Sequence, residues 1–487
     1  MGFFPLPGTG PKASSDRQRM KTKGIDLQRE LWSRCARISE RLLVGGHPGL
    51  KKAKRAFEAS FPSTYERVSP QSWKKPARES GYLLVGDHHG LARSQFFAAE
   101  ICRSFRPWTL GLEFVRGNQQ KTLDHWLGST RSPQALLREI HFEEQWGSFP
   151  QEGVLDLLQS AREIGCRLLA LAPDNPMGLS ARDRHFARLL LRIGPPVMAL
   201  IGDIHLDPMR LPAQLSKEGR SPTILHQNHA PYYFELAERH QPIPSLLRLE
   251  PRRFTWVDTH PILVEESALQ SLGPEDLVEA LPLPEHFAQI CEDLLIAQGQ
   301  APVPPPPLLL SFDPSQADVL NELVSTKKDL ERLCRELLIC GNAVLGPRGP
   351  VVVNLPGTNH LAEAAAKWVH CRFFPRPRRL LERSLWRLEN EIHGFQGSLR
   401  MNPLRNPMPL DWYLERFLSS RSRRNFHRME QTLFQSFSSS PLEEGSSFPP
   451  SGRLPNPSSK EGLVLLRWIG QTLGAEGAFL VGSKTLA

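Results

Sequence analysis

Short apolar runs alternate with amphipathic segments along the first half of the chain. The runs are expected to be β-strands and cover 82–85, 108–115, 167–172, 197–201, 223–225 and 254–257. Between them, apolar residues recur every three or four positions, as in Phe97, Ile101 and Phe105, which is typical of a helix with one buried face. Strands alternating with helices of this length predict an α/β fold, with a mostly parallel sheet flanked by helices on both faces.

The strand pattern weakens after residue 270, so a mainly α-helical C-terminal region is expected to follow the sheet. Long amphipathic segments predict helices over 318–340, 360–373 and 380–392, and a proline-rich stretch over 301–307 predicts a stiff linker. These patterns divide the chain into a disordered tail (1–24), an α/β domain with N-terminal helices (25–270), an α-rich domain (271–435), a disordered low-complexity linker (436–461) and a C-terminal helix (462–487).

Composition and charge narrow the class of protein only slightly. The 487 residues carry a formal charge of +9, which permits an acidic partner without requiring one. Basic stretches at 372–383 and 421–428 could contact nucleic acid or anionic lipid, but they are interpreted as arginine-bearing helix surface. No nucleic-acid-binding motif accompanies them, which argues against nucleic acid as a partner. The seven cysteines include no Cys-x-x-Cys pair, as expected in a reducing compartment. With no apolar export signal and no stretch of about 20 apolar residues, a cytoplasmic location without a transmembrane segment is expected.

Two segments repeat one pattern at the ends of two predicted strands. LLVGDHH and ALIGDIH each place Gly-Asp-x-His after an apolar run, and the repeated residues are Gly86, Asp87 and His89, then Gly202, Asp203 and His205. Glycine permits a sharp turn there. Ligands of parallel α/β sheets bind beyond the carboxyl ends of the strands, so these side chains are expected to converge with Glu113, which stands near the end of the strand over 108–115.

Imidazole nitrogens with carboxylate oxygens suit a transition metal such as Fe, Mn, Co or Zn. The candidate metal ligands are His89, Glu113, His205, Asp87 and Asp203. A histidine and a glutamate can also act together as general acid and base. In the structural alternative, each aspartate caps the next helix and each histidine packs under a loop.

Other polar positions carry weaker signals. Asp183 stands at a predicted helix start, where it would complement the helix dipole, and the preceding Arg182 could bind an anionic group of a substrate. Trp146 is interpreted as a packing residue. His226, His229 and His240 match no metal-binding spacing and are interpreted as part of a solvated loop, and His88 as pointing away from the site.

The motifs and their order resemble the ChaN-like family of the haem-binding uptake, Tiki and erythromycin-esterase superfamily. Members carry Gly-Glu/Asp-x-His after the first strand, a Leu-Glu strand, a downstream tryptophan, an Arg-Asp pair opening a helix and a closing Gly-x-x-His. This chain matches them at Gly86–His89, Leu112-Glu113, Trp146, Arg182-Asp183 and Gly202–His205. The similar region spans roughly residues 80–265, and the segment NHLAEAAAKWVH at Asn359–His370 resembles a C-terminal helix of longer bacterial members.

The resemblance implies two functions of different class. In the first, His89 and His205 bind haem or iron and the protein catalyses no reaction. The protein could act as a homodimer in this case. In the second, the chain is a metal-dependent hydrolase of peptides or esters, in which Glu113, Asp87, Arg182 and Asp183 are the catalytic residues. Asp87 stands where the family more often has glutamate, and no tyrosine is identified as a haem ligand. A third interpretation is a scaffold whose second half binds partners.

Overall fold

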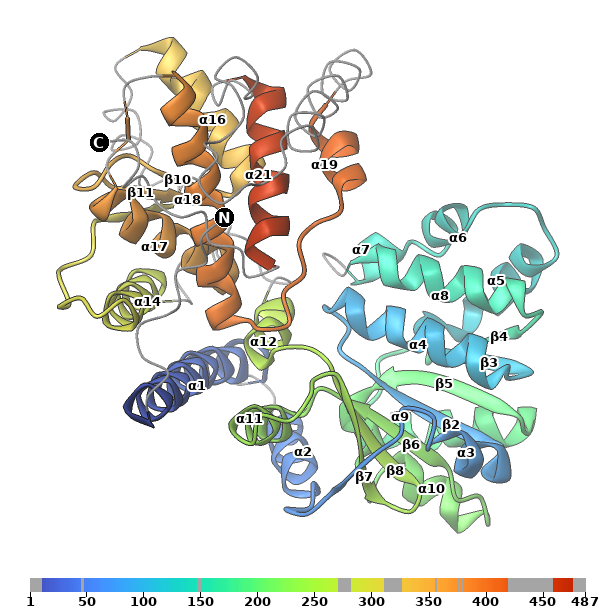
Figure 1. The fold of residues 1–487 in the computed structure, drawn as a ribbon. Helices are drawn as coiled ribbons and strands as arrows, with labels where there is room; N and C mark the ends of the chain where they lie inside the picture. Colours follow the sequence, from blue (N-terminus) through green and yellow to red (C-terminus); the bar gives the residue numbers. More distant parts are fainter. Residues whose placement is uncertain are drawn as a thin grey trace, which may run out of the picture. The chain divides into compact units, whose positions relative to one another are not determined.

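The structure is a computed structural model that describes residues 11–44, 48–146, 150–269, 282–310, 326–354, 357–374, 376–377, 380–418 and 459–475. The chain forms two compact units. The α/β unit is Arg29–Gly273, and the helical unit combines Met1–Gln28 with Pro274–Ala487. Helix α1 (Pro11–Ser39) contributes residues to both units and begins inside the segment 1–24 predicted to be a tail (Figure 1).

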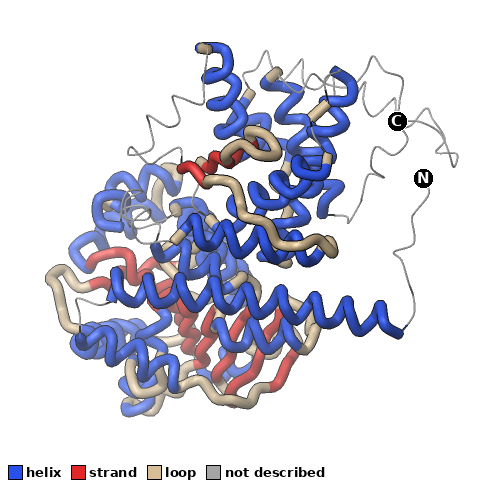
Figure 2. Tube along the Cα trace, turned by 90° about the vertical axis from the view of Figure 1, so that its left-hand side faces the viewer, coloured by secondary structure: helices blue, strands red, loops and turns tan. Residues whose placement is uncertain are grey.

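The α/β unit is built on one eight-stranded sheet, whose strands run side by side in Figure 2. In spatial order the strands are β1 (Glu66–Val68), β7 (Ser245–Glu250), β8 (Arg253–Val257), β6 (Thr223–Gln227), β2 (Tyr82–Asp87), β5 (Val197–Gly202), β3 (Thr109–Arg116) and β4 (Arg167–Ala172). The pairs from β8 to β4 are all parallel. Only the pairs that β7 makes with β8 and β1 are antiparallel, so the predicted mostly parallel sheet is confirmed.

The helices of the α/β unit are α2 (Pro48–Ala59), α3 (Lys74–Ser80), α4 (Ala92–Phe105), α5 (Gln120–Leu127), α6 (Pro133–Glu139), α7 (Phe142–Trp146), α8 (Gln151–Glu163), α9 (Leu179–Ile193), α10 (Leu211–Lys217), α11 (Ala230–Glu238) and α12 (Pro261–Leu269). Short turns of other helix types occur at Glu40–Val44, Gly117–Gln119 and Asp203–Leu206. Several of these helices follow a parallel strand and return the chain to the start of the next, as the βαβ pattern requires.

Two apolar cores lie on opposite faces of this sheet. Side chains alternate between the faces of a strand. On β2, Leu83 and Val85 therefore pack with residues of α4 and α8, whereas Tyr82 and Leu84 pack with residues of α9 and α10. Figure 1 shows α4 and α8 running beside each other. Because both faces are covered, β2 and β5 are buried along their whole lengths and read as continuous apolar runs.

The helical unit contains helices α14 (Leu283–Ala297), α16 (Lys327–Cys340), α17 (Thr358–Phe373), α18 (Leu380–Met401), α19 (Leu410–Phe417) and α21 (Lys460–Ala475). It also holds a small sheet in the order β10 (Asn342–Val344), β11 (Val351–Val353) and β9 (Leu308–Leu310). Helix α17 packs on α18, and α18 packs on α21. No described helix is both long and apolar enough to cross a bilayer.

The sequence pattern located most of these elements but not all. The predicted α-rich C-terminal region is confirmed, and its small sheet was not predicted. Strands β1 and β7 were also missed, since β1 is only three residues long and β7 has exposed positions in its second half. The predicted linker over 436–461 lies outside the described residues except for its last three positions, and residues 318–325 of the predicted helix over 318–340 also lie outside them.

Candidate functional site

The candidate site forms where β2, β3 and β5 end. Strand β5 lies between β2 and β3, and Asp87 pairs in register with Gly202. The side chains that follow β2 and β5 therefore leave the sheet next to each other, with Glu113 of β3 on the other side of β5. A Cβ atom on Gly202 would lie 3.1 Å from His89 Nε2 and 3.3 Å from Glu113 Oε2, so both groups approach the backbone at this glycine.

His89 is held by a carboxylate on one side of its ring. Its Nδ1 lies 2.6 Å from Asp87 Oδ2, and the other oxygen of Asp87 accepts a hydrogen bond of 2.6 Å from Gln95. Burial lowers the pKa of His89, but the negative charges of Asp87 and Glu113 outweigh it and raise the pKa to about 8. The His89 side chain is 29% exposed, whereas that of Asp87 is 4% exposed, so the imidazole is the accessible member of the pair.

Glu113 is a buried carboxylate surrounded by donors. Its Oε1 accepts a hydrogen bond from Arg182 and lies 3.4 Å from His205 Nε2, and its Oε2 accepts one of 2.5 Å from the Gly202 amide. Burial raises the pKa of Glu113, but His205, His89 and Arg182 outweigh it and lower the pKa well below the ordinary value. Glu113 is therefore an anion at neutral pH, not a proton donor.

His205 is oriented by a second carboxylate, that of Asp183. Its Nδ1 lies 2.5 Å from Asp183 Oδ1, while Asp183 Oδ2 accepts a 2.6 Å hydrogen bond from Arg210. Burial lowers the pKa of His205, but Asp183 and Glu113 outweigh it and raise the pKa. Asp183 was interpreted as complementing the dipole of its helix or, in the hydrolase alternative, as a catalytic residue. It is 3% exposed and fixes the ring of His205 from the first turns of α9.

A third histidine–carboxylate pair lies beside the site. Asp203 Oδ1 is 2.8 Å from His226 Nδ1, and His226 Nε2 accepts a 3.0 Å hydrogen bond from Arg253. Since β2 lies between β5 and β6, the Asp203 side chain passes over Gly86, where a Cβ would stand 2.1 Å from Asp203 Oδ1. The solvated loop predicted for His226 is wrong, because His226 belongs to β6 and is fully buried.

The predicted site residues are thus brought together in part. His89, Glu113, Arg182 and His205 face a common point, and Asp87 and Asp183 stand behind the two histidines. Asp203, one of the predicted metal ligands, turns to His226 instead. Within the described ranges, no three His, Cys, Asp or Glu side chains are grouped closely enough to hold a metal ion.

The structure also places the side chains of the neighbouring predicted positions. Trp146 packs against His89 with a ring-centroid distance of 5.2 Å, and its indole nitrogen donates to the Phe114 carbonyl. His88 lies 2.9 Å from the Gln227 carbonyl oxygen through Nε2. Neither Asp87 nor Asp203 caps a helix through its side chain, since the caps that precede α4 and the Asp203–Leu206 turn have no side-chain hydrogen bond.

Sequence reasoning missed three groups that complete the site: Gln95, Arg210 and the Gly202 amide. Gln95 stands in the helix after the first Gly-Asp-x-His motif, where an amide near a buried carboxylate is a usable signal. Arg210 follows the second motif by five residues in a loop of no special pattern, so nothing marks it in the sequence. The Gly202 amide is a backbone donor that only the strand order assigns to Glu113.

A known protein family matches a segment of the chain that contains part of this site. Residues 73–178 match the family model described as "Haem-binding uptake, Tiki superfamily, ChaN". The matched segment includes Asp87, His89 and Glu113 and ends before Arg182. No curated protein and no solved structure gives a significant match. Over residues 73–178, the chain is similar to the ChaN family of the Tiki superfamily, which confirms the resemblance predicted from the order of the motifs.

Proposed function

We propose that the α/β unit binds haem through its iron at the carboxyl ends of β2, β3 and β5, with His89 as the axial donor. The observation that carries this proposal is the Asp87–His89 pair, at 2.6 Å, on a partly exposed imidazole. A carboxylate that accepts the Nδ1 hydrogen leaves Nε2 as the donor atom, and this arrangement is common behind metal-ligating histidines. Haem, when bound, supplies a redox-active iron centre.

Two arginines at the site suit the propionates of haem or another anionic group. Arg182 bonds Glu113 and its charge acts on His89, so its guanidinium is fixed near His89, whereas Arg210 bonds Asp183 behind His205. The Nε atoms of both arginines are buried, with no acceptor among the described residues. A buried donor without a partner is costly. These Nε atoms are closed to a ligand, but the Arg182 side chain is 29% exposed, so its other N–H groups could bind an anionic group at this edge of the sheet.

A metal-dependent hydrolase is the second candidate. Its ligands would be His89, His205 and Glu113. His205 Nε2 and Glu113 Oε1 lie 3.4 Å apart and each histidine has a carboxylate behind it, but the three side chains would have to move closer together to hold an ion. Such an ion would have to displace Arg182 and the Gly202 amide from Glu113. Haem needs only one donor atom from the protein. The hydrogen bonds that Glu113 already makes to Arg182 and the Gly202 amide therefore favour haem over an ion with three protein ligands.

A haemin titration followed at the Soret band tests the proposal. Wild-type protein is expected to give a saturable, shifted Soret band, and His89→Ala is expected to weaken binding by at least about tenfold, since it removes the donor atom. His125→Ala, at an exposed histidine of α5, is the matched control and is expected to bind like wild type. Equal binding by His89→Ala and wild type would refute the role of His89.

Titration with Mn²⁺, Co²⁺ and Zn²⁺ separates the second candidate. A three-ligand site predicts that His205→Ala and His89→Ala both abolish binding of the ion and any metal-dependent hydrolysis of peptides or esters. The haem site predicts that His205→Ala, once its fold has been checked by circular dichroism, still binds haemin. Tight ion binding without a specific Soret change would replace the haem proposal with the hydrolase.

A further inference from the structure

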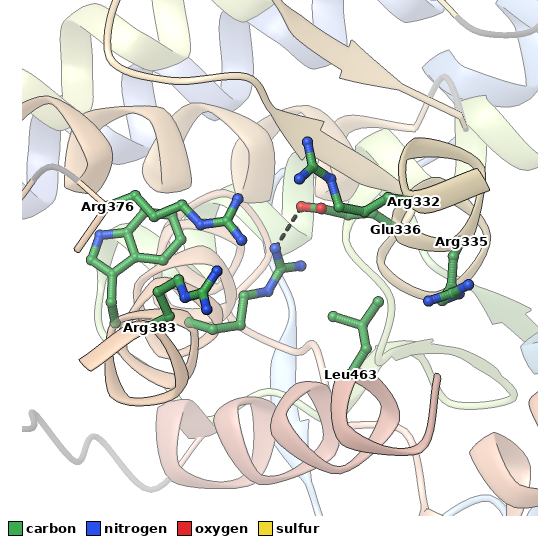
Figure 3. Close-up of a pocket in the computed structure, with 8 residues that line it drawn as sticks. Arg332, Arg335, Glu336, Arg376, Arg383 and Leu463 are labelled. Carbon is green, nitrogen blue, oxygen red and sulfur yellow. Dashed lines mark hydrogen bonds and ion pairs between the residues drawn. The ribbon is translucent and has the colours of Figure 1, made fainter. Parts of the chain in front are cut away.

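A small basic hollow lies within the helical unit, far along the sequence from the histidine site. It is lined by Arg332, Arg335, Glu336, Arg376, Arg383, Trp386, Arg387 and Leu463 (Figure 3). The residues come from α16, α18 and α21 and from the short segment before α18. The hollow encloses little space, which suits a single small group better than a large planar cofactor.

The hollow contains far more positive than negative charge. Five of its lining residues are arginines, and Glu336 is its one carboxylate. That carboxylate is already engaged, since Arg387 donates to it at 2.5 Å. In Figure 3 the guanidinium groups of Arg332, Arg376 and Arg383 gather around this pair. Like charges held close together repel, so the arrangement is most stable when an anion joins it.

Unsatisfied donors mark the same place. The Nε atoms of Arg383 and Arg387 are buried and have no acceptor among the described residues. The Arg387 side chain is only 8% exposed, and its other contacts are to Glu336, Glu391 and the Cys340 sulfur. Burial, together with the charges of Arg332, Arg387 and Arg383, lowers the pKa of Arg376. This shift agrees with a surplus of guanidinium groups over carboxylates.

An aromatic ring fixes one side of the hollow. The Arg376 guanidinium lies 5.9 Å from the centre of the Trp386 ring. Trp386 is itself held, because its indole nitrogen donates a 2.7 Å hydrogen bond to the Phe374 carbonyl. Stacking on an aromatic face limits the orientations of a guanidinium while leaving its N–H groups available. The site is therefore preorganised at Arg376 before any ligand arrives.

We propose that this hollow binds a phosphoryl group, either free phosphate or the phosphate of a larger ligand such as a lipid headgroup. A phosphoryl group carries up to two charges and three or more acceptor oxygens pointing in different directions. Guanidinium groups from separate segments match that geometry better than they match a planar carboxylate. This inference is independent of the haem proposal, since it concerns a different unit and different residues.

The test uses the full chain and inorganic phosphate, followed by isothermal titration calorimetry at low ionic strength. Arg376→Gln and Arg383→Gln are each expected to weaken phosphate binding by about tenfold or more, the usual loss of one charge-assisted hydrogen bond. Arg416→Gln is the matched control, because Arg416 also stacks on a tryptophan, 5.2 Å from the Trp412 ring centre, outside the hollow. Arg387 is left unchanged, since it also pairs with the buried Glu391.

Two further arms identify the source of the phosphoryl group. Phosphatidylcholine vesicles with and without phosphatidic acid are compared in a sedimentation assay, and succinate replaces phosphate in the calorimeter. Phosphate binding, or binding to the phosphatidic acid vesicles, that is lost in Arg383→Gln and kept in Arg416→Gln supports the proposal. It is overturned if succinate binds as tightly as phosphate, if Arg416→Gln is as weak as Arg383→Gln, or if neither phosphate nor the vesicles bind.

Discussion

Replacing Asp87 by asparagine tests whether haem binding needs the hydrogen bond that orients His89, and not only the histidine itself. In the wild-type protein, a carboxylate oxygen faces His89 Nδ1, so Nδ1 carries hydrogen and Nε2 offers its lone pair to the site. Asparagine keeps an oxygen for Gln95, which now bonds the other carboxylate oxygen. It presents an NH₂ group to the imidazole. The neutral ring is then expected to change tautomer, with the hydrogen on Nε2.

The size of the effect follows from the pKa of His89, which stands at about 8 against an ordinary 6.5. The difference corresponds to about 2 kcal/mol of preference for the charged ring. Burial alone lowers the pKa, and Asp87 is the strongest of the groups that raise it. In Asp87→Asn we therefore expect the pKa of His89 to fall to about 6.5 or below, and haemin affinity to fall about 10- to 100-fold.

Carbethoxylation of histidine measures this pKa in the intact chain. Diethylpyrocarbonate reacts with the neutral ring, and mass spectrometry of the peptide that contains His89 gives its rate at each pH. The midpoint of the rate is expected near pH 8 in the wild type and in Asp411→Asn, an exposed aspartate of α19. A midpoint that stays near 8 in Asp87→Asn would refute the assigned role of Asp87. A wild-type midpoint near 6.5 would refute the electrostatic argument itself.

Three other predictions concern pH and packing. Since ligation needs neutral His89, with its pKa of about 8, haemin affinity should rise about tenfold per pH unit from about pH 6 to 8 and then level off; a flat titration contradicts this. Gly86→Ala should lower the free energy of unfolding in urea by about 1–3 kcal/mol, because the new Cβ would lie 2.1 Å from Asp203 Oδ1. Gly178→Ala, whose Cβ would have no atom within 4 Å, should cost far less. Equal losses would contradict the close approach of Asp203 to Gly86. Burial raises the pKa of Glu363, but nearby Arg and Lys charges outweigh burial and lower the pKa to about 2. The ionised carboxylate therefore contributes about 3 kcal/mol to the free energy of unfolding, complete above about pH 5 and lost as the pH falls from 4.5 to 2. Glu363→Gln should destabilise the chain at pH 7 and lose less stability in acid, as measured by urea unfolding.

How far the sequence predicted the site depends on the spatial order of the strands. The apolar runs before Asp87 and Asp203 located β2 and β5, and the rule of shared carboxyl ends placed their motifs at one edge. Neither apolar run predicts the strand order β6-β2-β5-β3. Each strand is buried on both faces, so its residues do not show which strands lie beside it. That order decides that Asp203 reaches His226 across Gly86, while Asp183 takes the place behind His205.

The helical unit shows the opposite limit of prediction. Apolar periodicity predicted helices at the places of α16, α17, α18 and α21 but not α14 or α19, and the basic stretch over 372–383, which holds Arg376 and Arg383 of the hollow, was interpreted as ordinary helix surface. Arg383 and Arg387 lie one turn apart on α18, and such spacing is common on exposed helices. What distinguishes them is burial against Glu336 and Arg376 from other segments, which local spacing cannot encode.

The place of β5 in the sheet has a consequence for how the chain folds as it is synthesised. β2 and β3 are consecutive along the chain, yet they do not touch, because β5 separates them and is made about eighty residues later. When the ribosome has released only the segment up to residue 178, Glu113 still lacks the Gly202 amide, His205 and Arg182. The space between β2 and β3 is filled only when β5 pairs with both strands. This pairing closes a long loop of chain, which slows folding. An uncompensated acidic group and two open strand edges are therefore present on the nascent chain until residue 205 emerges, a period in which chaperone binding would protect it.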